Sequence, residues 1–445
     1  MHHAEDAEEA VMRHKVLLPA LGAAVLLAGA CSGNTDAKKS TCVHVIDENT
    51  GRTGAACLPL APDSARVDRV APHFTHPTRI TNPTHPTAEV TQTIYGGQES
   101  GKPFRTEVTL LPGTRTITWG DRTIHAVTSQ YVAFSDGRVH EVADDWYAQA
   151  DDGSVWYLGE DVFNYDHGVV ADTEGTWQAG RGHAPGAMIM PAHPRKGDVY
   201  RTENLPGVVF EQVTVRSVGQ TVEGPYGKIE NAMTVHELHM DGTTEDKVFA
   251  PGYGEFSTGS VTGDLEAVSL AVPTDARRAP VPAGLGALDK AVRAAHAGPT
   301  PATVRAAREA WDAYRASEAV PALLERQMTR DLDTWREAPR DRAAALRVEQ
   351  NTTDLRLRHE PVGTVDRERL GMWARQLGID AHAGDKGAVA GDVTGLELVR
   401  QRHDTPESAA LTADLKKARE AADRKDTAGA GRNAQQLIED IAALR

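Results

Sequence analysis

The sequence predicts an α+β multidomain protein, in which an antiparallel β sandwich or open barrel precedes an α-helical bundle. Aromatic residues are concentrated before residue 260, and short Asp-Gly turn sequences recur in the same stretch. Aromatic and β-branched side chains favour strands, and such turns favour hairpins. Beyond residue 283, Ala, Arg and Leu dominate and helix-start residues recur. A chain of 445 residues is long enough for about three domains.

The first thirty residues are typical of an export signal. Fifteen uncharged and mostly apolar residues run from Val16 to Ala30. This run is too short for a bilayer span of about 20 residues but suits the apolar region of a signal peptide. Positive residues directly precede it, whereas residues 1–11 contain no Lys or Arg. We therefore predict a signal peptide over residues 1–30, with translation starting at Met12.

The residues around Cys31 resemble the lipidation signal of bacterial lipoproteins. Residues 27–33, LAGACSG, place small side chains before a cysteine, and in such proteins that cysteine is diacylated, commonly with palmitate. Two acyl chains give stable membrane anchoring. The expected location is the cell membrane, lipid-anchored at its extracytoplasmic face. The alternative is an ordinary secretory signal that is cut near Ala30.

Export also accounts for the two remaining cysteines. Cys42 and Cys57 are fifteen residues apart, and an oxidising compartment favours a disulfide between them. Residues 31–73 are then the lipidated cysteine and a tether, because the Pro-rich sequence that follows Cys57 favours extended chain.

An antiparallel β domain is expected over residues 74–270 and an α-helical domain over residues 284–445. Between them, residues 271–283 contain three prolines, which prevent a regular helix or a central strand. We therefore expect an exposed linker between two halves that fold independently.

The β domain resembles a family of exported bacterial β proteins over about residues 74–270. The segments that carry the resemblance are residues 146–161 (WYAQADDGSVWYLGED), 174–180 (EGTWQAG), 188–194 (MIMPAHP) and 250–254 (APGYG). The helical half looks like a companion domain of similar lipoproteins. The resemblance implies a Trp- and Tyr-rich β fold and export, and it assigns no chemistry and no catalytic residue.

Charge and missing motifs exclude several classes of function. The 48 Lys and Arg against 63 Asp and Glu give a net charge of −15, which repels phosphate backbones, so nucleic acid is not an expected partner. The sequence contains no Gly-x-Ser-x-Gly elbow, phosphate-binding Gly-rich loop or His-Glu-x-x-His helix. The catalytic residues are therefore unknown, and a non-enzyme is favoured.

Candidate metal ligands lie in residues 235–248, where an Asp-Gly pair predicts a hairpin with a two-residue loop. In that register Glu237 is opposite Asp246. The side-chain period of two then places Glu237, His239 and Asp246 on one face, and Glu245 on the opposite face. One imidazole and two carboxylates suit a divalent cation such as zinc, manganese or iron. The alternative is a solvated hairpin face that binds nothing.

The expected function is that of a membrane-anchored extracytoplasmic lipoprotein that acts as a binding or interaction module. Its expected partners are the membrane, through the lipid anchor, and a ligand or envelope protein that the sequence does not identify. The alternative is a metal-dependent enzyme or metal-handling protein that uses the hairpin site. The sequence establishes no cofactor, and a divalent metal at this hairpin is the candidate.

Overall fold

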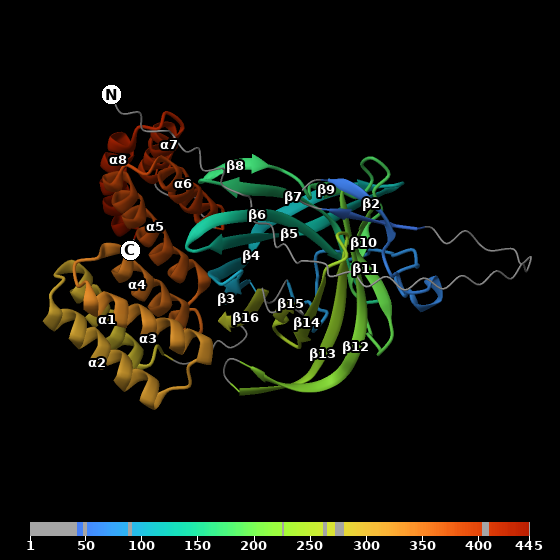
Figure 1. The fold of residues 1–445 in the computed structure, drawn as a ribbon, viewed down its shortest axis with the longest axis horizontal. Helices are drawn as coiled ribbons and strands as arrows, with labels where there is room; N and C mark the ends of the chain where they lie inside the picture. Colours follow the sequence, from blue (N-terminus) through green and yellow to red (C-terminus); the bar gives the residue numbers. More distant parts are fainter. Residues whose placement is uncertain are drawn as a thin grey trace, which may run out of the picture.

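The structure is a computed structural model that describes residues 42–47, 51–87, 91–224, 227–260, 265–271, 280–402 and 409–444. A β-rich region is followed by a helical region (Figure 1), which confirms the predicted α+β class. The signal peptide, Met12 and Cys31 lie outside the described residues, and so does most of the Pro-rich linker. None of the described helices is long and apolar enough to cross a membrane.

One antiparallel sheet forms most of the β-rich region, in the order β10-β7-β6-β5-β4-β3-β16-β15-β14-β13-β12-β11, with β8 and β9 paired to β7. Its end strands β10 and β11 lie beside each other but form no ladder among the described strands, so the sheet bends without closing. The strands are β3 (Gln92–Glu99), β4 (Lys102–Trp119), β5 (Arg122–Ser135), β6 (Arg138–Gln149), β7 (Val155–Asp166), β8 (Val169–Asp172), β9 (Trp177–Gln178), β10 (Ala187–Met190), β11 (Val199–Leu205), β12 (Val209–Gly224), β13 (Gly227–His239), β14 (Thr244–Ala250), β15 (Gly254–Ser260) and β16 (Leu265–Ala271).

The largest buried cluster of the β domain joins strands from both ends of the sheet order. Tyr157 of β7 and Val213 of β12 belong to it, together with Val235 of β13 and Phe249 of β14. Strands far apart in the sheet order therefore share one core. Burial of this apolar surface stabilises the bend by roughly 25 cal/mol per Å² removed from water.

The N-terminal hairpin packs on this domain. Strands β1 (His44–Asp47) and β2 (Arg52–Cys57) are joined by the Cys42–Cys57 disulfide, which confirms the predicted pairing. Leu58, within the expected tether, is buried against Met240 near the β13–β14 turn. The β1–β2 hairpin and Leu58, which fall within the expected tether, therefore pack on the β-rich region.

Eight α-helices follow in the described residues, in two groups with separate cores. Helices α1 to α4 pack around the fully buried Trp311 and Trp335, and helices α5 to α8 pack around small and branched residues. The helices are α1 (Ala283–Ala297), α2 (Pro301–Ser317), α3 (Ala322–Glu337), α4 (Arg342–Arg356), α5 (Val362–Ala383), α6 (Lys386–Gln401), α7 (Ala409–Asp423) and α8 (Thr427–Ala443).

A buried network of charges connects the two halves of the chain. Arg402, directly after α6, donates to Glu107 of β4 at 2.6 Å, and Arg105 of β4 donates to Asp354 of α4 at 2.9 Å. Arg369 of α5 lies between them and contacts both acidic residues. These side chains are almost fully buried, apart from Arg105 at 16% exposed. The halves therefore share a fixed interface in addition to the linker.

The interface also needs two glycines. Gly168, between β7 and β8, has a φ of 75°, which is unfavourable for any other residue. A Cβ atom there would lie 1.9 Å from the carbonyl oxygen of Gly387 in α6. The two backbones can approach so closely only because neither residue has a side chain.

Candidate functional site

The β13–β14 hairpin positions the candidate ligands, and its register differs by one residue from the prediction. Leu238 pairs with Thr244, and the N–H of His239 donates to the carbonyl of Thr243, so the loop that this last pair closes contains Met240, Asp241 and Gly242. Gly242 has a φ of 86°, and its N–H donates to the carbonyl of His239. A turn followed by a left-handed glycine is a common three-residue hairpin, so the predicted two-residue loop is wrong.

This one-residue difference reverses the faces of two acidic residues. Glu237 pairs with Glu245, which places Glu245 on the face of Glu237 and His239. Asp246 pairs with His236 on the opposite face, and its carboxylate lies 2.8 Å from the imidazole of that residue. Asp246 is therefore not part of the cluster that contains Glu237 and His239, which corrects the predicted ligand set.

The third member of the cluster comes from the neighbouring strand. Glu211 of β12 pairs with His239 of β13, and its Oε1 lies 3.1 Å from His239 Nδ1. Glu211, Glu237 and His239 each offer one ligand atom, and these atoms all lie within 4.8 Å of one another. The three side chains point toward the interior of the bent sheet, on the face of the buried Val213 and Val235.

Burial and charge shift the protonation of this cluster. Burial alone would lower the pKa of His239, but the hydrogen bond and charge of Glu211 raise it to about 9. Burial alone would raise the pKa of Glu211, but the contact with His239 lowers it to about 2. Burial raises the pKa of Glu237 to about 7, and the charge of Glu211 adds to the shift. At neutral pH His239 and Glu211 form an ion pair, and Glu237 is only partly ionised.

Lys247 of β14 provides a second positive charge beside the cluster. Its Nζ lies 2.5 Å from Glu237 Oε2, and both side chains are mostly buried. Burial opposes its charge, yet Glu237 and the neighbouring acidic residues raise the pKa of Lys247 well above its usual value. The ammonium therefore remains charged and compensates part of the acidic interior.

A second group of carboxyl groups lies across the open seam of the sheet. Asp145 of β6 pairs directly with Glu160 of β7, and both are buried. Glu160 shares a hydrogen bond with Glu203 of β11, which in turn pairs with Glu211. Burial raises the pKa of Asp145 to about 7 and that of Glu160 to about 8. The carboxyl groups of Asp145 and Glu160 therefore keep protons near neutral pH.

One buried nitrogen of the cluster lacks a hydrogen bond in the described part of the chain. It is His239 Nε2, which lies 3.8 Å from Glu245 Oε2. An unsatisfied buried polar atom costs about 1–3 kcal/mol. Carboxylate oxygens and an imidazole nitrogen that converge in this way suit a metal cation.

Sequence reasoning found Glu237 and His239 but not Glu211. Glu211 precedes His239 by 28 residues and belongs to another strand. Once β12 is known to be a strand, the alternation of its side chains predicts that Glu211 faces the interior. Only the register between β12 and β13 shows that Glu211 lies beside His239. No short motif contains this pair.

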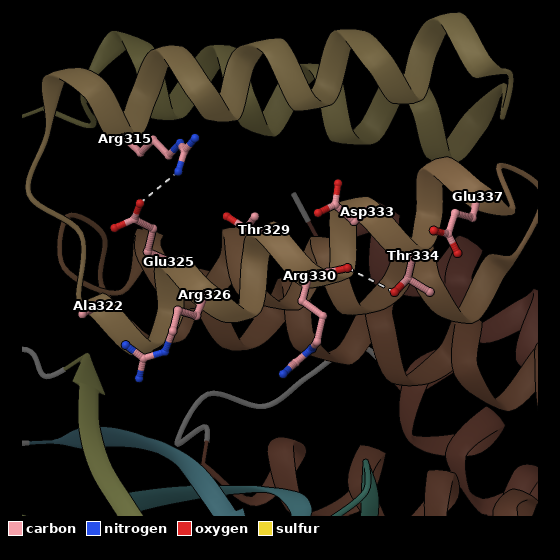
Figure 2. A pocket seen from close by; sticks show the side chains of 9 residues that line it. All are labelled: Arg315, Ala322, Glu325, Arg326, Thr329, Arg330, Asp333, Thr334 and Glu337. Atoms are coloured by element: carbon pink, nitrogen blue, oxygen red, sulfur yellow. Dashed lines mark hydrogen bonds and ion pairs between the residues drawn. The ribbon is translucent and has the colours of Figure 1, made fainter.

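A separate surface groove runs along α3 in the helical half, and Arg315 of α2 also lines it (Figure 2). Its volume is about 650 Å³, and its lining is mixed in charge. Arg315 and Glu325 form an ion pair of 3.0 Å across it. Because its charges compensate each other at the surface, this groove is a weaker candidate than the interior cluster.

No protein-family model, no curated protein and no solved structure matches this chain.

Proposed function

We propose that this chain is a lipid-anchored extracytoplasmic binding protein and that the interior of its β domain binds a metal cation. The observation that carries the proposal is the convergence of Glu211, Glu237 and His239, with ligand atoms within 4.8 Å of one another. Carboxylate and imidazole ligands favour zinc, manganese or iron over copper(I), which prefers sulfur ligands.

The charge balance of the interior supports a cation. Carboxyl groups outnumber the two basic side chains, Lys247 and His239, in this interior, and burial keeps several of them protonated. The charged form of Lys247 is favoured by four neighbouring acidic residues, of which Glu237 has the largest effect on its pKa. The others are Glu255, Glu211 and Glu245. A bound cation would favour the ionised form of these carboxyl groups, because buried charges are stable when they are paired or coordinate a metal. The acidic residues of this interior are Asp145, Glu160, Glu203, Glu211, Glu237, Glu245 and Glu255.

Metal binding can be tested on one strand with a matched control. His239 and His236 lie on opposite faces of β13, and only His239 belongs to the cluster. The test is titration of the purified full chain with zinc, manganese and iron, followed by elemental analysis. We expect about one equivalent in the wild type and in His236→Ala, and loss of that equivalent in His239→Ala. Equal metal content in all three proteins, or none in any, would contradict the proposal.

The anchor is proposed from the sequence around Cys31. Cys31→Ser removes the thiol that lipidation requires, so we expect this variant in the medium or unprocessed. Mass spectrometry of the wild type should find a diacylated N-terminal Cys31. A wild-type protein that is fully soluble and carries no lipid would contradict this part of the proposal.

A second candidate function is metal-dependent hydrolysis. One observation favours it: Glu245 lies on the face of the cluster, with Oε2 3.8 Å from His239 Nε2, so a carboxylate is near enough to act as a base for metal-bound water. In this case metal-loaded protein should hydrolyse nitrophenyl esters or phosphates, and Glu245→Gln should lose that activity while it keeps the metal. Absence of turnover with both substrate types favours binding alone.

A further inference from the structure

Tyr200 of β11 is a buried phenol without a hydrogen-bond partner. Its side chain is fully buried, and its hydroxyl donates to no atom and accepts from none in the described part of the chain. Buried tyrosine hydroxyls usually find a partner, and an unsatisfied group of this kind costs about 1–3 kcal/mol. The unsatisfied hydroxyl of Tyr200 therefore indicates that this group has a ligand to bind.

The strand register places this phenol in the row of the cluster. Tyr200 pairs with Val213 of β12, and Val213 pairs with Glu237 of β13. All three residues thus face the interior of the sheet. Adjacent strands are about 4.8 Å apart, so roughly 10 Å separates the Cα atoms of Tyr200 and Glu237. Two long side chains can bridge this span from opposite ends.

Electrostatics gives a second indication that the two groups are close. Burial raises the pKa of Tyr200, and the charge of Glu237 is the next largest cause of that shift. This agrees with the register, which places both side chains in the same interior.

We propose that Tyr200 is the fourth ligand of the cluster and that the cation is ferric iron. This inference rests on the proposed function, because it assigns the metal for the same site. Glu211, Glu237 and the phenolate of Tyr200 supply three negative charges, and His239 supplies a neutral nitrogen. Three anionic oxygen ligands match a hard trivalent cation better than zinc or manganese(II).

Binding changes protonation and leaves the oxidation state of iron unchanged. When the iron bonds form, the phenol of Tyr200 and the imidazolium of His239 each release one proton to solvent, and the protonated fraction of Glu237 releases its proton as well. The iron exchanges its citrate oxygens for these ligands, so free citrate leaves. The ammonium of Lys247 gives up its contact with Glu237 Oε2 and stays close to the other carboxylates of the interior. Ferric iron supplied as a citrate complex is sufficient for this exchange, and no reductant or oxidant is required.

The test is a titration of the metal-free full chain, in detergent, with ferric citrate. A phenolate bound to ferric iron absorbs visible light, so we expect a coloured complex that reaches its maximum at one equivalent. Tyr200→Phe should keep its circular dichroism spectrum and lose the band entirely. Tyr165→Phe is the matched control, because Tyr165 lies on β7 beside Thr394 and Arg419 of the helical half, and it should keep the full band.

The outcomes separate this inference from the proposed function. If the wild type binds zinc or manganese through His239 but gives no band with ferric iron, the choice of ferric iron is overturned and the metal site remains. A band that persists in Tyr200→Phe overturns the role of Tyr200. If no metal binds at all, both fail. If Tyr200→Phe does not fold, two other measurements replace it. We then expect His239→Ala to lose the band, and the resonance Raman spectrum of the wild type to show the pattern of a tyrosinate bound to iron. Absence of that pattern overturns the role of Tyr200.

Discussion

Lys247 and Glu237 form an ion pair of 2.5 Å between β14 and β13, at the metal site that we propose. The side chain of Glu237 is only 4% exposed and that of Lys247 is 19% exposed. A buried carboxylate of this kind needs a positive partner. Lys247 therefore provides the positive charge in the metal-free protein, and a metal cation competes with it for the same oxygen.

Substitution of Lys247 by Met should weaken the metal-free protein and tighten metal binding. Removal of the ammonium leaves Glu237 uncompensated, which costs about 3 kcal/mol of unfolding free energy. Metal affinity should rise roughly tenfold, equal to about 1.4 kcal/mol. The measurement is chemical denaturation with and without metal. Lys228→Met is the control, because that side chain is 72% exposed. Weaker metal binding by Lys247→Met would show that the lysine does not compete with the cation.

The metal-free β domain should lose stability as the pH rises from about 5.5 to 8.5. The pKa of Asp145 is raised to about 7 and that of Glu160 to about 8, because both are buried. Each group binds its proton more tightly in the folded state. The stability from this source is complete below the ordinary carboxyl pKa of about 4 and is lost as the pH rises through the folded values. His239, with its pKa raised to about 9, changes stability in the same direction above pH 6.5.

Asp145→Asn tests this dependence, because asparagine keeps the shape and cannot ionise. Its unfolding free energy at pH 8.5 should exceed that of the wild type by about 2 kcal/mol, and its Tm should vary less between pH 5.5 and 8.5. Asp136→Asn, at the exposed β5–β6 turn, should follow the wild type. A wild-type Tm that rises toward pH 8.5 would contradict the assignment of protonated carboxyl groups.

The hairpin shows where sequence reasoning reaches its limit. Alternation along β13 correctly places Glu237 and His239 on one face. The turn type is less certain from sequence, since an Asp-Gly pair suits both a two-residue and a three-residue loop. A shift of one residue moves every side chain of the partner strand to the other face. For this reason the predicted site contains Asp246 and lacks Glu245, whereas the structure has the reverse.

The fold class and the disulfide followed from composition and spacing, but the contacts between distant segments did not. The aromatic half is a bent antiparallel sheet and the Ala- and Arg-rich half is helical, as predicted. The network around Glu107 and Arg369 depends on residues 262 positions apart in the chain. Neither residue has a local pattern that indicates a buried partner in the other half.

Cleavage of the Pro-rich linker should leave the two halves bound together. The network around Glu107 and Arg402, together with the stacking of Phe134 on Trp373 at 5.5 Å, holds them independently of the linker. Limited proteolysis within residues 272–279, followed by size-exclusion chromatography, should give one peak that contains both fragments. Separate peaks for a β-rich and a helical fragment would show that the linker is the main connection.

Arg402→Met should destabilise the whole chain. Arg402 donates to Glu107 at 2.6 Å and to Gln130 at 3.0 Å, and its side chain is 1% exposed. Removal of one partner from a buried network costs about 3–5 kcal/mol. Arg424→Met should cost less than about 0.5 kcal/mol, because that arginine is 65% exposed and its ion pair with Glu420 is 3.9 Å long. Equal unfolding free energies for the two variants would rule out a stabilising role for the network.

The most direct test of the central claim is anomalous X-ray diffraction from crystals of the metal-loaded protein. We expect one strong anomalous peak in the interior of the β domain. It should lie about 2.0–2.2 Å from a ring nitrogen of His239 and at bonding distance from carboxylate oxygens of Glu211 and Glu237. Density without such a peak at saturating metal, or a peak bound only to surface residues, would contradict the proposed metal site.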